Sequence, residues 1–202
     1  MRRVRKSNKL VYDVGINDAD YNVTRYEIVD GKRKKVACRY YRTWKSMLRR
    51  CYSEEYQLGK PTYKGCNVCD EWLIFSNFKS WMEKQEWEGK SLDKDLLKDG
   101  NKVYCPEWCI FVDRKINSFV NDQSRSRGKY MIGVHWDKQT RKFKSQCNNP
   151  FTGKNEGLGY FTDELEAHLA WKTRKHELAC QLTDSELVSD PRLAEALRTR
   201  YL

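Results

Sequence analysis

Apolar residues recur at helical spacing in two stretches of the first half of the chain. Segment 38–52 carries one such stripe, and segment 71–84 carries a second that is rich in aromatic residues. Side chains three or four positions apart share one face of a helix, so both segments are predicted to be helices with one buried face. Short alternating pieces between residues 10 and 37 predict a small hairpin region, to which the sequence assigns no chemistry.

A strand, a turn, a second strand and a helix are predicted between residues 91 and 121. The strands span 91–96 and 108–112, the turn lies at 99–101, and Asp113 is the expected N-cap of the helix. Apolar residues at helical spacing after the cap would face the two strands. This stretch is therefore predicted to be a hairpin with a short helix packed against it.

Asp93 on the first of these strands can approach Asn117 on the helix if the helix packs on the hairpin. A carboxylate and an amide oxygen, with the other positions left to water and phosphate, are ligands that Mg²⁺ or Mn²⁺ accepts. The pair therefore predicts a divalent metal site of the kind that nucleases use. The alternative is that both residues are ordinary turn and cap residues.

The second half of the chain changes to strand-like alternation. Three strands are predicted over 131–136, 141–147 and 156–161, followed by a helix over 163–182 with Thr162 as its cap. In the middle strand, apolar and small residues alternate with basic and amide residues. One sheet face can therefore meet the helix while the other presents hydrogen-bond donors, as a face that enters the DNA major groove would.

Composition and charge favour an acidic polymer as the partner. The chain has 39 Lys and Arg against 28 Asp and Glu, which gives a formal net charge of +11, and nucleic acid fits this balance best. No apolar run approaches the roughly 20 residues needed to cross a bilayer. The basic start lacks the apolar core of a signal peptide. We therefore expect a cytoplasmic protein with no membrane partner.

Eight cysteines are scattered along the chain. In a cytosolic protein they are expected to be free or metal-bound rather than paired. Four thiolates could close a structural zinc site, and the candidates by spacing are Cys66, Cys69, Cys105 and Cys109. Buried free thiols that fill the core are the alternative.

The order of motifs resembles the ββα-metal core of phage HNH endonucleases, which include the HNH homing enzymes. The residues that carry the likeness are LDKD at 92–95, YCPEWCIFV at 104–112 and the helix with Asn117. The order of WKSMLRRCY, YKGCNVCDEW and FSNF upstream extends it to about residues 41–121. The resemblance implies an endonuclease in which Asp93 and Asn117 bind the metal.

Two positions depart from that family. Lys94 stands where most members have the histidine that acts as general base, and Trp108 stands where the central asparagine usually buttresses the hairpin. A lysine can accept a proton only if its pKa falls from roughly 10.4 toward neutrality. Asp95 or a metal-bound water could act instead.

A second likeness covers the C-terminal strands. GVHW, KFKSQC and LGYF, followed by a helix with Ala167 and Ala170, resemble the APETALA-type DNA-binding domain, which is often fused to phage HNH nucleases and reads the major groove with its sheet. The resemblance implies base contacts from His135, Gln146, Asn148 and Asn155, and phosphate contacts from Lys142 and Lys144. Before this domain, Arg127 and Lys129 carry charge suited to tracking a phosphate backbone.

The expected fold class is α+β. It would comprise an HNH ββα-metal core with flanking helices, followed by a three-stranded sheet plus helix and a last helix that starts at Asp190. The expected segments are a basic arm and extended region (1–37), a nuclease domain (38–122), a linker (123–129) and a DNA-binding domain (130–202).

The expected function is magnesium-dependent hydrolysis of double-stranded DNA. One ββα core addresses one strand, so we expect a monomer that nicks, in the host cytoplasm if the gene is a phage's. One alternative is a DNA-binding protein that keeps the nuclease scaffold without catalysis. Another is a zinc-stapled structural protein with a protein partner.

Overall fold

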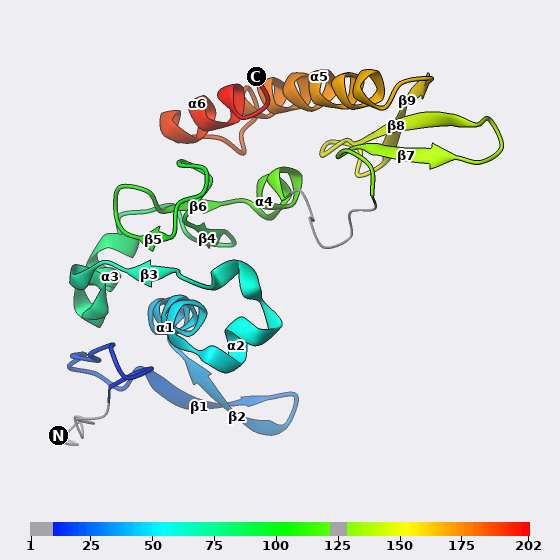
Figure 1. Ribbon diagram of the computed structural model, residues 1–202. Helices are drawn as coiled ribbons and strands as arrows, with labels where there is room; N and C mark the ends of the chain where they lie inside the picture. Colours follow the sequence, from blue (N-terminus) through cyan, green and yellow to red (C-terminus); the bar gives the residue numbers. More distant parts are fainter. Residues whose placement is uncertain (1–9, 122–128) are drawn as a thin grey trace. The chain divides into compact units, whose positions relative to one another are not determined.

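The computed structural model describes residues 10–121 and 129–202, and the chain divides into two compact units, Met1–Phe111 and Val112–Leu202. Both units mix helices with small sheets (Figure 1), so the fold class is α+β. The basic residues of 1–9 and the predicted contact Arg127 lie outside the described residues. No helix in the described ranges is long and apolar enough to cross a membrane.

The first unit begins with a hairpin and continues with short helices and two-stranded pairings. Its elements are β1 (Thr24–Val29), β2 (Lys32–Ala37), α1 (Arg39–Tyr52), α2 (Glu54–Gly59), η1 (Pro61–Tyr63), β3 (Asn67–Val68), η2 (Asp70–Leu73), α3 (Phe75–Met82), β4 (Ser91–Asp93) and β5 (Val103–Tyr104). β6 (Ile110–Val112) crosses the boundary between the units. β1 and β2 pair antiparallel, β3 pairs with β5 in parallel, and β4 pairs with β6.

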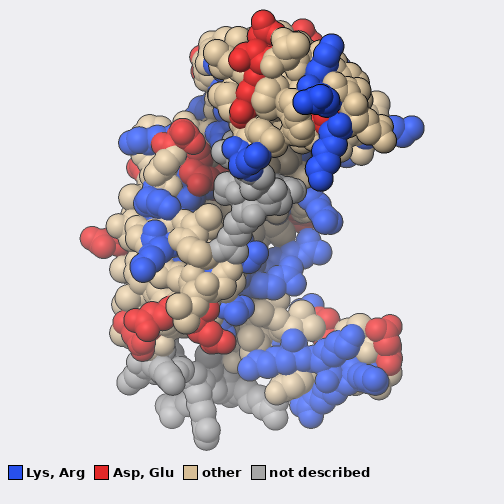
Figure 2. All heavy atoms as spheres, turned by 45° about the vertical axis from the view of Figure 1, so that its right-hand side comes forward, with Lys and Arg blue, Asp and Glu red and all other residues tan. Residues whose placement is uncertain are grey.

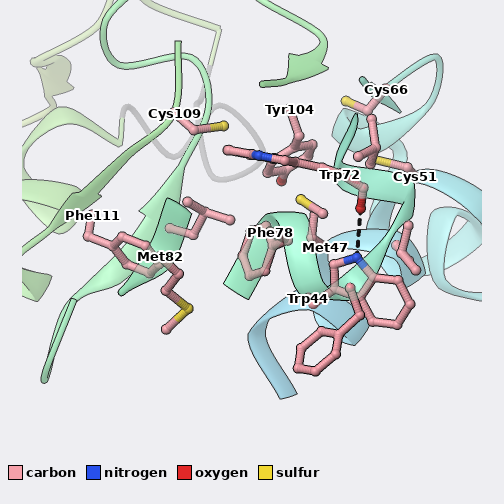
Figure 3. Packing of buried hydrophobic residues seen from close by; sticks show 14 residues of the cluster. Trp44, Met47, Cys51, Cys66, Trp72, Phe78, Met82, Tyr104, Cys109 and Phe111 are labelled. Carbon is pink, nitrogen blue, oxygen red and sulfur yellow. Dashed lines mark hydrogen bonds between the residues drawn. The ribbon is translucent and has the colours of Figure 1, made fainter. Parts of the chain in front are cut away.

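The core of the first unit forms around α1 and α3. The apolar stripe of α1 is buried as predicted, and Cys38 caps the helix by accepting a hydrogen bond from the Tyr41 N–H. The Trp44 Nε1–H donates to the carbonyl oxygen of Trp72 at 2.7 Å (Figure 3). This bond ties α1 to η2 through a fully buried polar pair.

The helix predicted over 71–84 is interrupted in the structure. It is divided into η2 and α3, with Ile74 in extended conformation between them. Ile16 causes the break, since its N–H donates to the Leu73 carbonyl at 2.8 Å and its carbonyl accepts from the Phe75 N–H at 3.0 Å. A strand-like bridge from a distant segment replaces one turn of the helix.

The predicted hairpin over 91–112 is also rearranged. β4 ends at Asp93, and the pairing of β4 with β6 leaves a long loop between them. That loop contains β5, which pairs with β3 instead, in the register Asn67 to Val103. The two-residue β3–β5 pairing has no local sequence signal, because each partner is too short to show alternation.

The second unit contains one antiparallel sheet and three helices among its described residues. Its elements are α4 (Arg114–Val120), β7 (Val134–Asp137), β8 (Lys142–Asn148), β9 (Asn155–Phe161), α5 (Glu164–Thr183) and α6 (Pro191–Thr199), with the strands in the order β7-β8-β9. Asp113 and Asp190 cap α4 and α6 as predicted. The cap of α5 is Asp163 and not Thr162, because the Asp163 carboxylate accepts from the Glu166 N–H.

Helix α5 covers one face of the sheet. Ser145 and Cys147 of β8 are buried on that side, and Gly133, just before β7, packs against Trp171 of α5. Gly133 has a φ of +79°, and a Cβ at this position would lie 2.1 Å from the Trp171 ring. Only glycine allows both the backbone conformation and the close approach.

Lys175 attaches α4 to α5 inside the second unit. Its side chain is 7% exposed, its Nζ donates to the Phe119 carbonyl at 2.6 Å, and the same Nζ lies 3.7 Å from the centroid of the Phe119 ring. Phe119 is in the last turn of α4, where carbonyl groups lack partners within the helix. The sequence grouped helix 113–121 with the strands before it, whereas in the structure α4 belongs to the second unit.

We expect Lys175→Ala to lower the free energy of unfolding of the second unit by about 2 kcal/mol, since it removes a charge-assisted hydrogen bond and a cation–π contact. Hydrogen exchange of the α4 and α5 amides in urea measures this loss. Lys172→Ala on the same helix is the control. An equal effect of the two substitutions would show that Lys175 does not hold α4.

Candidate functional site

Asp93 shapes the chain directly after β4. Its Oδ1 accepts hydrogen bonds from the backbone N–H groups of Asp95 at 3.0 Å and Leu96 at 2.8 Å. An aspartate that binds the N–H groups two and three residues ahead forms a local turn. This turn is the reason that β4 ends at Asp93 instead of continuing to residue 96 as predicted.

Lys94 points into the protein and is held as a cation. Its side chain is 5% exposed, and its Nζ donates to Asp95 Oδ2 at 2.8 Å and to the Asn101 carbonyl at 3.1 Å. Burial lowers the pKa of Lys94, but the hydrogen bond and charge of Asp95 outweigh this, so the pKa is raised overall. The condition for Lys94 as a general base, a pKa lowered toward neutrality, is therefore not met.

Asn101 braces the loop that contains Lys94. Its Nδ2 donates to the carbonyl oxygens of Lys94 and Val103, and its Oδ1 accepts from the Val103 N–H at 3.2 Å. The sequence assigned Asn101 only to a turn and looked for the bracing residue at position 108. Trp108 is instead 38% exposed, with the Lys98 Nζ 4.7 Å from its ring centroid. An asparagine after a turn glycine, next to a buried strand, is the signal that would have identified Asn101.

Arg50 of α1 lies under the same strand. Its Nη1 donates to the Tyr104 hydroxyl at 3.4 Å and to the Leu92 carbonyl at 3.5 Å. These bonds turn the Arg50 side chain toward the residue that precedes Asp93. Arg50 thus places a positive charge beside the Leu92 carbonyl, directly before Asp93.

The Asp93 carboxyl is half-buried and has a raised pKa. The first cause is burial, and the second is the charge of the neighbouring Asp95 carboxylate, which together outweigh the two backbone hydrogen bonds. Both causes penalise the ionised form. A bound cation would offset both by stabilising the ionised carboxylate.

Asn117, the second predicted ligand, is half-buried on α4 in the second unit, whereas Asp93 belongs to the first. Each unit is a fold of its own, so the pairing of Asp93 with Asn117 stays a prediction. Within residues 10–121 and 129–202, no group of three or more His, Cys, Asp or Glu side chains could hold a metal ion. A metal at Asp93 would therefore need amide, water or phosphate oxygens as its other ligands.

All eight cysteines are free thiols. The Cys69 N–H donates to the Tyr104 carbonyl, and the Cys109 N–H donates to the Cys105 carbonyl, so these three cysteines share one region of the backbone. Cys66 lies instead beside Cys51, at the opposite end of Trp72 from Cys109 (Figure 3). Burial raises the pKa of all four predicted zinc thiols. Zinc binding by them stays a prediction.

The register of the C-terminal sheet places the predicted DNA contacts on one face. The cross-strand rows are His135–Lys144–Tyr160, Asp137–Lys142, Gln146–Gly157 and Asn148–Asn155. Residues directly opposite each other share a sheet face, and the other face, with Ser145 and Cys147, packs on α5. A bulge between Ser145 and Gln146, accompanied by a φ of +127° at Gly159, keeps this alternation in step.

Tyr160 is a residue of this face that the sequence did not single out. Its side chain is 46% exposed, and the Lys144 Nζ lies 5.8 Å from its ring centroid. The alternation of EGLGYF alone would place Tyr160 on the same face as Glu156, and only the bulge turns it away from the helix. Lys129, another predicted contact, precedes β7 with its Nζ 5.0 Å from the Tyr130 ring centroid.

The turn between β8 and β9 is held to α5 by a chain of polar contacts. Asn149 Oδ1 accepts from the Phe151 and Thr152 N–H groups, and its Nδ2 donates to Glu156 at 2.6 Å. Glu156 in turn pairs with Arg174 of α5 at 2.7 Å. These contacts fix the end of the sheet where two of the predicted DNA contacts pair with each other.

A cavity of about 550 Å³ lies between this turn and the start of α4. Its lining includes Arg114 and Lys115 on one side and Asn148 and Phe151 on the other. Two cations and Asn148, a predicted DNA contact of the sheet, therefore line the same cavity.

No protein-family model, curated protein or solved structure matches this chain. The candidate sites rest on the sequence motifs and on the geometry described above.

We expect Asp93→Asn to keep the fold at least as stable as the natural protein at pH 7. The amide oxygen can still accept from Asp95 and Leu96, while the cost of a buried charge disappears. A carboxyl whose native pKa is raised stabilises the fold only while protonated, so this gain should vanish below the unfolded pKa of about 3.9. Urea unfolding of the natural protein and of the Asp93→Asn variant between pH 3.5 and pH 8 measures this difference in stability.

Asp93→Ala is the matched control for this substitution. It removes the acceptor as well as the charge, so it should lose about 1–3 kcal/mol at every pH. If the asparagine variant were as unstable as the alanine variant at pH 7, the fold would need the charge of the Asp93 carboxylate and not only its acceptor oxygen.

Proposed function

We propose that this protein is an HNH-type, metal-dependent endonuclease that nicks double-stranded DNA and is targeted by its C-terminal sheet. The observation that carries the proposal is the loop after β4, where a half-buried carboxylate is held by two backbone N–H groups. Lys94 and Asn101 brace this loop from inside. A half-buried carboxylate held rigidly beside a buried lysine is costly for a merely structural turn, and such arrangements concentrate at functional sites.

In this proposal, Asp93 and Asn117 hold Mg²⁺ or Mn²⁺ together with water and phosphate oxygens. The ion would polarise the scissile phosphate and stabilise the leaving oxygen. The chain acts as a monomer and cuts one strand, since it offers one such centre.

Asp95 is the best candidate for the proton acceptor. Its side chain is 49% exposed, and it is ion-paired with Lys94 at 2.8 Å. Lys94 remains protonated, so its role is to position Asp95 through their ion pair. Asp95 therefore takes the role of general base in place of the lysine, since an exposed carboxylate can reach a water molecule.

The sheet face of the second unit supplies the DNA contacts. Basic side chains Lys142 and Lys144 would bind phosphates, while the amide residues Gln146, Asn148 and Asn155 would hydrogen-bond to base edges. Their presence on one face with His135 and Tyr160 supports this use. Basic residues scattered over several faces would not define one DNA-binding surface.

A DNA-binding protein without catalysis is the second candidate. The observation that favours it is the raised pKa of Lys94, which leaves the position of the family's general base occupied by a cation. Both candidate functions use the sheet face to bind DNA. They differ only in whether Asp93, at the end of β4, binds a metal that supports cleavage.

We expect the purified protein to nick supercoiled plasmid with Mg²⁺ or Mn²⁺, and Asp93→Asn to reduce the rate at least about a hundredfold by removing a metal ligand. The rate should also fall on acidification, because protons compete with the metal for a carboxyl of raised pKa. Gel analysis of relaxed against supercoiled plasmid gives the rate.

Asp20→Asn, an exposed acid of the first unit, is the control for the same charge change. Absence of nicking by the natural protein, with DNA binding intact, would favour the second candidate.

We expect Lys142→Gln combined with Lys144→Gln to weaken binding to every duplex and to reduce the slope of log affinity against log salt by about 2. Gln146→Ala should instead change the preference between duplex sequences by about 1–3 kcal/mol. Fluorescence anisotropy at several salt concentrations measures both. Lys172→Gln with Arg198→Gln, on helices outside the sheet, is the control pair. Equal losses from the two pairs would argue against the sheet face.

A further inference from the structure

The hairpin of β1 and β2 carries a charge and exposure pattern that the proposed catalytic and sheet sites do not use. Its strands are joined by a two-residue turn at Asp30 and Gly31, with φ values of +53° and +72°. The hairpin extends away from α1 within the first unit (Figure 1). At its base, the Cys38 N–H donates to the Val23 carbonyl at 2.8 Å, directly before the helix cap. The hairpin is thus attached to the core while its outer part is exposed.

Positive charge gathers on this hairpin (Figure 2). Residues 24–37 contain five basic and two acidic side chains. The basic residues are Arg25, Lys32, Arg33, Lys34 and Lys35. All five are exposed, and four of them follow one another along β2. A two-stranded ribbon with this charge is complementary to a polyanion.

One face of the hairpin also exposes apolar side chains. Tyr26 is 60% exposed and Ile28 is 72% exposed, and both point to the same face as the residues opposite them. Those opposite residues are Lys35 and Arg33, respectively. The Arg33 guanidinium carbon lies 4.2 Å from the Tyr26 ring centroid. The face therefore combines an aromatic ring, an aliphatic side chain and two cations.

A two-stranded hairpin is marginally stable in water by itself, and exposed Tyr and Ile side chains add to its stability only when something covers them. Duplex DNA can do so, because the major groove is about 12 Å wide and admits a two-stranded ribbon. Apolar side chains can contact base edges and thymine methyl groups there, while lysines reach the phosphates on both sides.

We propose that the β1–β2 hairpin is a DNA-binding ribbon that lies in a groove of duplex DNA. Tyr26 and Ile28 face the bases with Arg33 and Lys35 beside them, and Lys32 and Lys34, on the opposite face of the ribbon, extend past its edge to the phosphate backbone. The inference rests on the proposed function only in taking DNA as the partner, and it needs no cleavage. It gives the first unit a DNA contact of its own, separate from the sheet face of the second.

The test measures binding of the full chain to a fluorescent duplex of about 30 base pairs, without added metal, over a range of salt concentrations. The hairpin variant combines Lys32→Gln, Lys34→Gln and Lys35→Gln. The matched control combines Lys60→Gln, Lys64→Gln and Lys84→Gln, which are exposed lysines of the same unit. Because each lost phosphate contact reduces the salt slope by about 0.9, the hairpin variant should lose about 2–3 in slope and at least about tenfold in affinity at low salt. The control should change little.

Two further measurements separate the ribbon from general electrostatics. Tyr26→Ser with Ile28→Ser should weaken binding several-fold and leave the salt slope unchanged, since it removes no charge. On the natural chain, duplex DNA should protect the hairpin lysines from amine-reactive labelling more than Lys60, a readout that does not depend on any variant folding.

Equal losses from the two lysine triples, or labelling that DNA leaves unchanged on the hairpin, would overturn the inference. So would stronger protection by single-stranded RNA or by anionic lipid vesicles than by duplex DNA. These outcomes are distinct from failure of the proposed function. A protein that binds DNA without its hairpin could still nick, and one that binds through its hairpin but never nicks would lose only the nuclease assignment.

Discussion

The candidate metal site depends on one buried cation, the ammonium group of Lys94. It is held between the carboxylate of Asp95 and the carbonyl of Asn101, and the Asn101 amide closes the loop by donating back to the Lys94 carbonyl. A buried ammonium without these partners would be very costly, so the loop after β4 keeps one conformation. Asp93 begins this loop, and its carboxylate orientation follows from it.

The neighbouring residues of this network have different roles. Lys94 has a structural role and cannot act as a base, because a lysine that is buried and ion-paired in this way stays protonated. Asp93 and Asp95 then carry the chemistry that can be proposed for the site, one as a ligand and the other as a proton acceptor. A neutral histidine has a single N–H donor and could not bond to both oxygen atoms, whereas the Lys94 ammonium donates to both.

A common device recurs on the two surfaces proposed to contact DNA. On the hairpin, Arg33 lies over Tyr26, and on the sheet, Lys144 lies near Tyr160. Each pair keeps an aromatic ring exposed and a cation beside it, which suits a ligand with both flat apolar bases and charged phosphates. The surfaces belong to different units, so they can supply separate contacts to one long polymer.

The sequence by itself determined the features that depend on neighbours along the chain. These include the buried stripe of α1, the caps Asp113 and Asp190, and the alternation that puts the predicted contacts of β8 on one face. Each arises from a local period or a hydrogen bond to a nearby N–H. The kind of candidate site, an aspartate with a second acid beside it in a strongly basic chain, could also be predicted from the sequence alone.

Only the tertiary structure decided the features that depend on distant partners. Ile16 divides the second helix, β3 takes β5 out of the predicted hairpin, and Lys175 binds α4 into the second unit. Whether Lys94 could act as a base was likewise undecided until its partners were known. The physical reason is the same throughout: hydrogen bonds and charges across long sequence separations set backbone breaks and pKa values, and no local pattern encodes them.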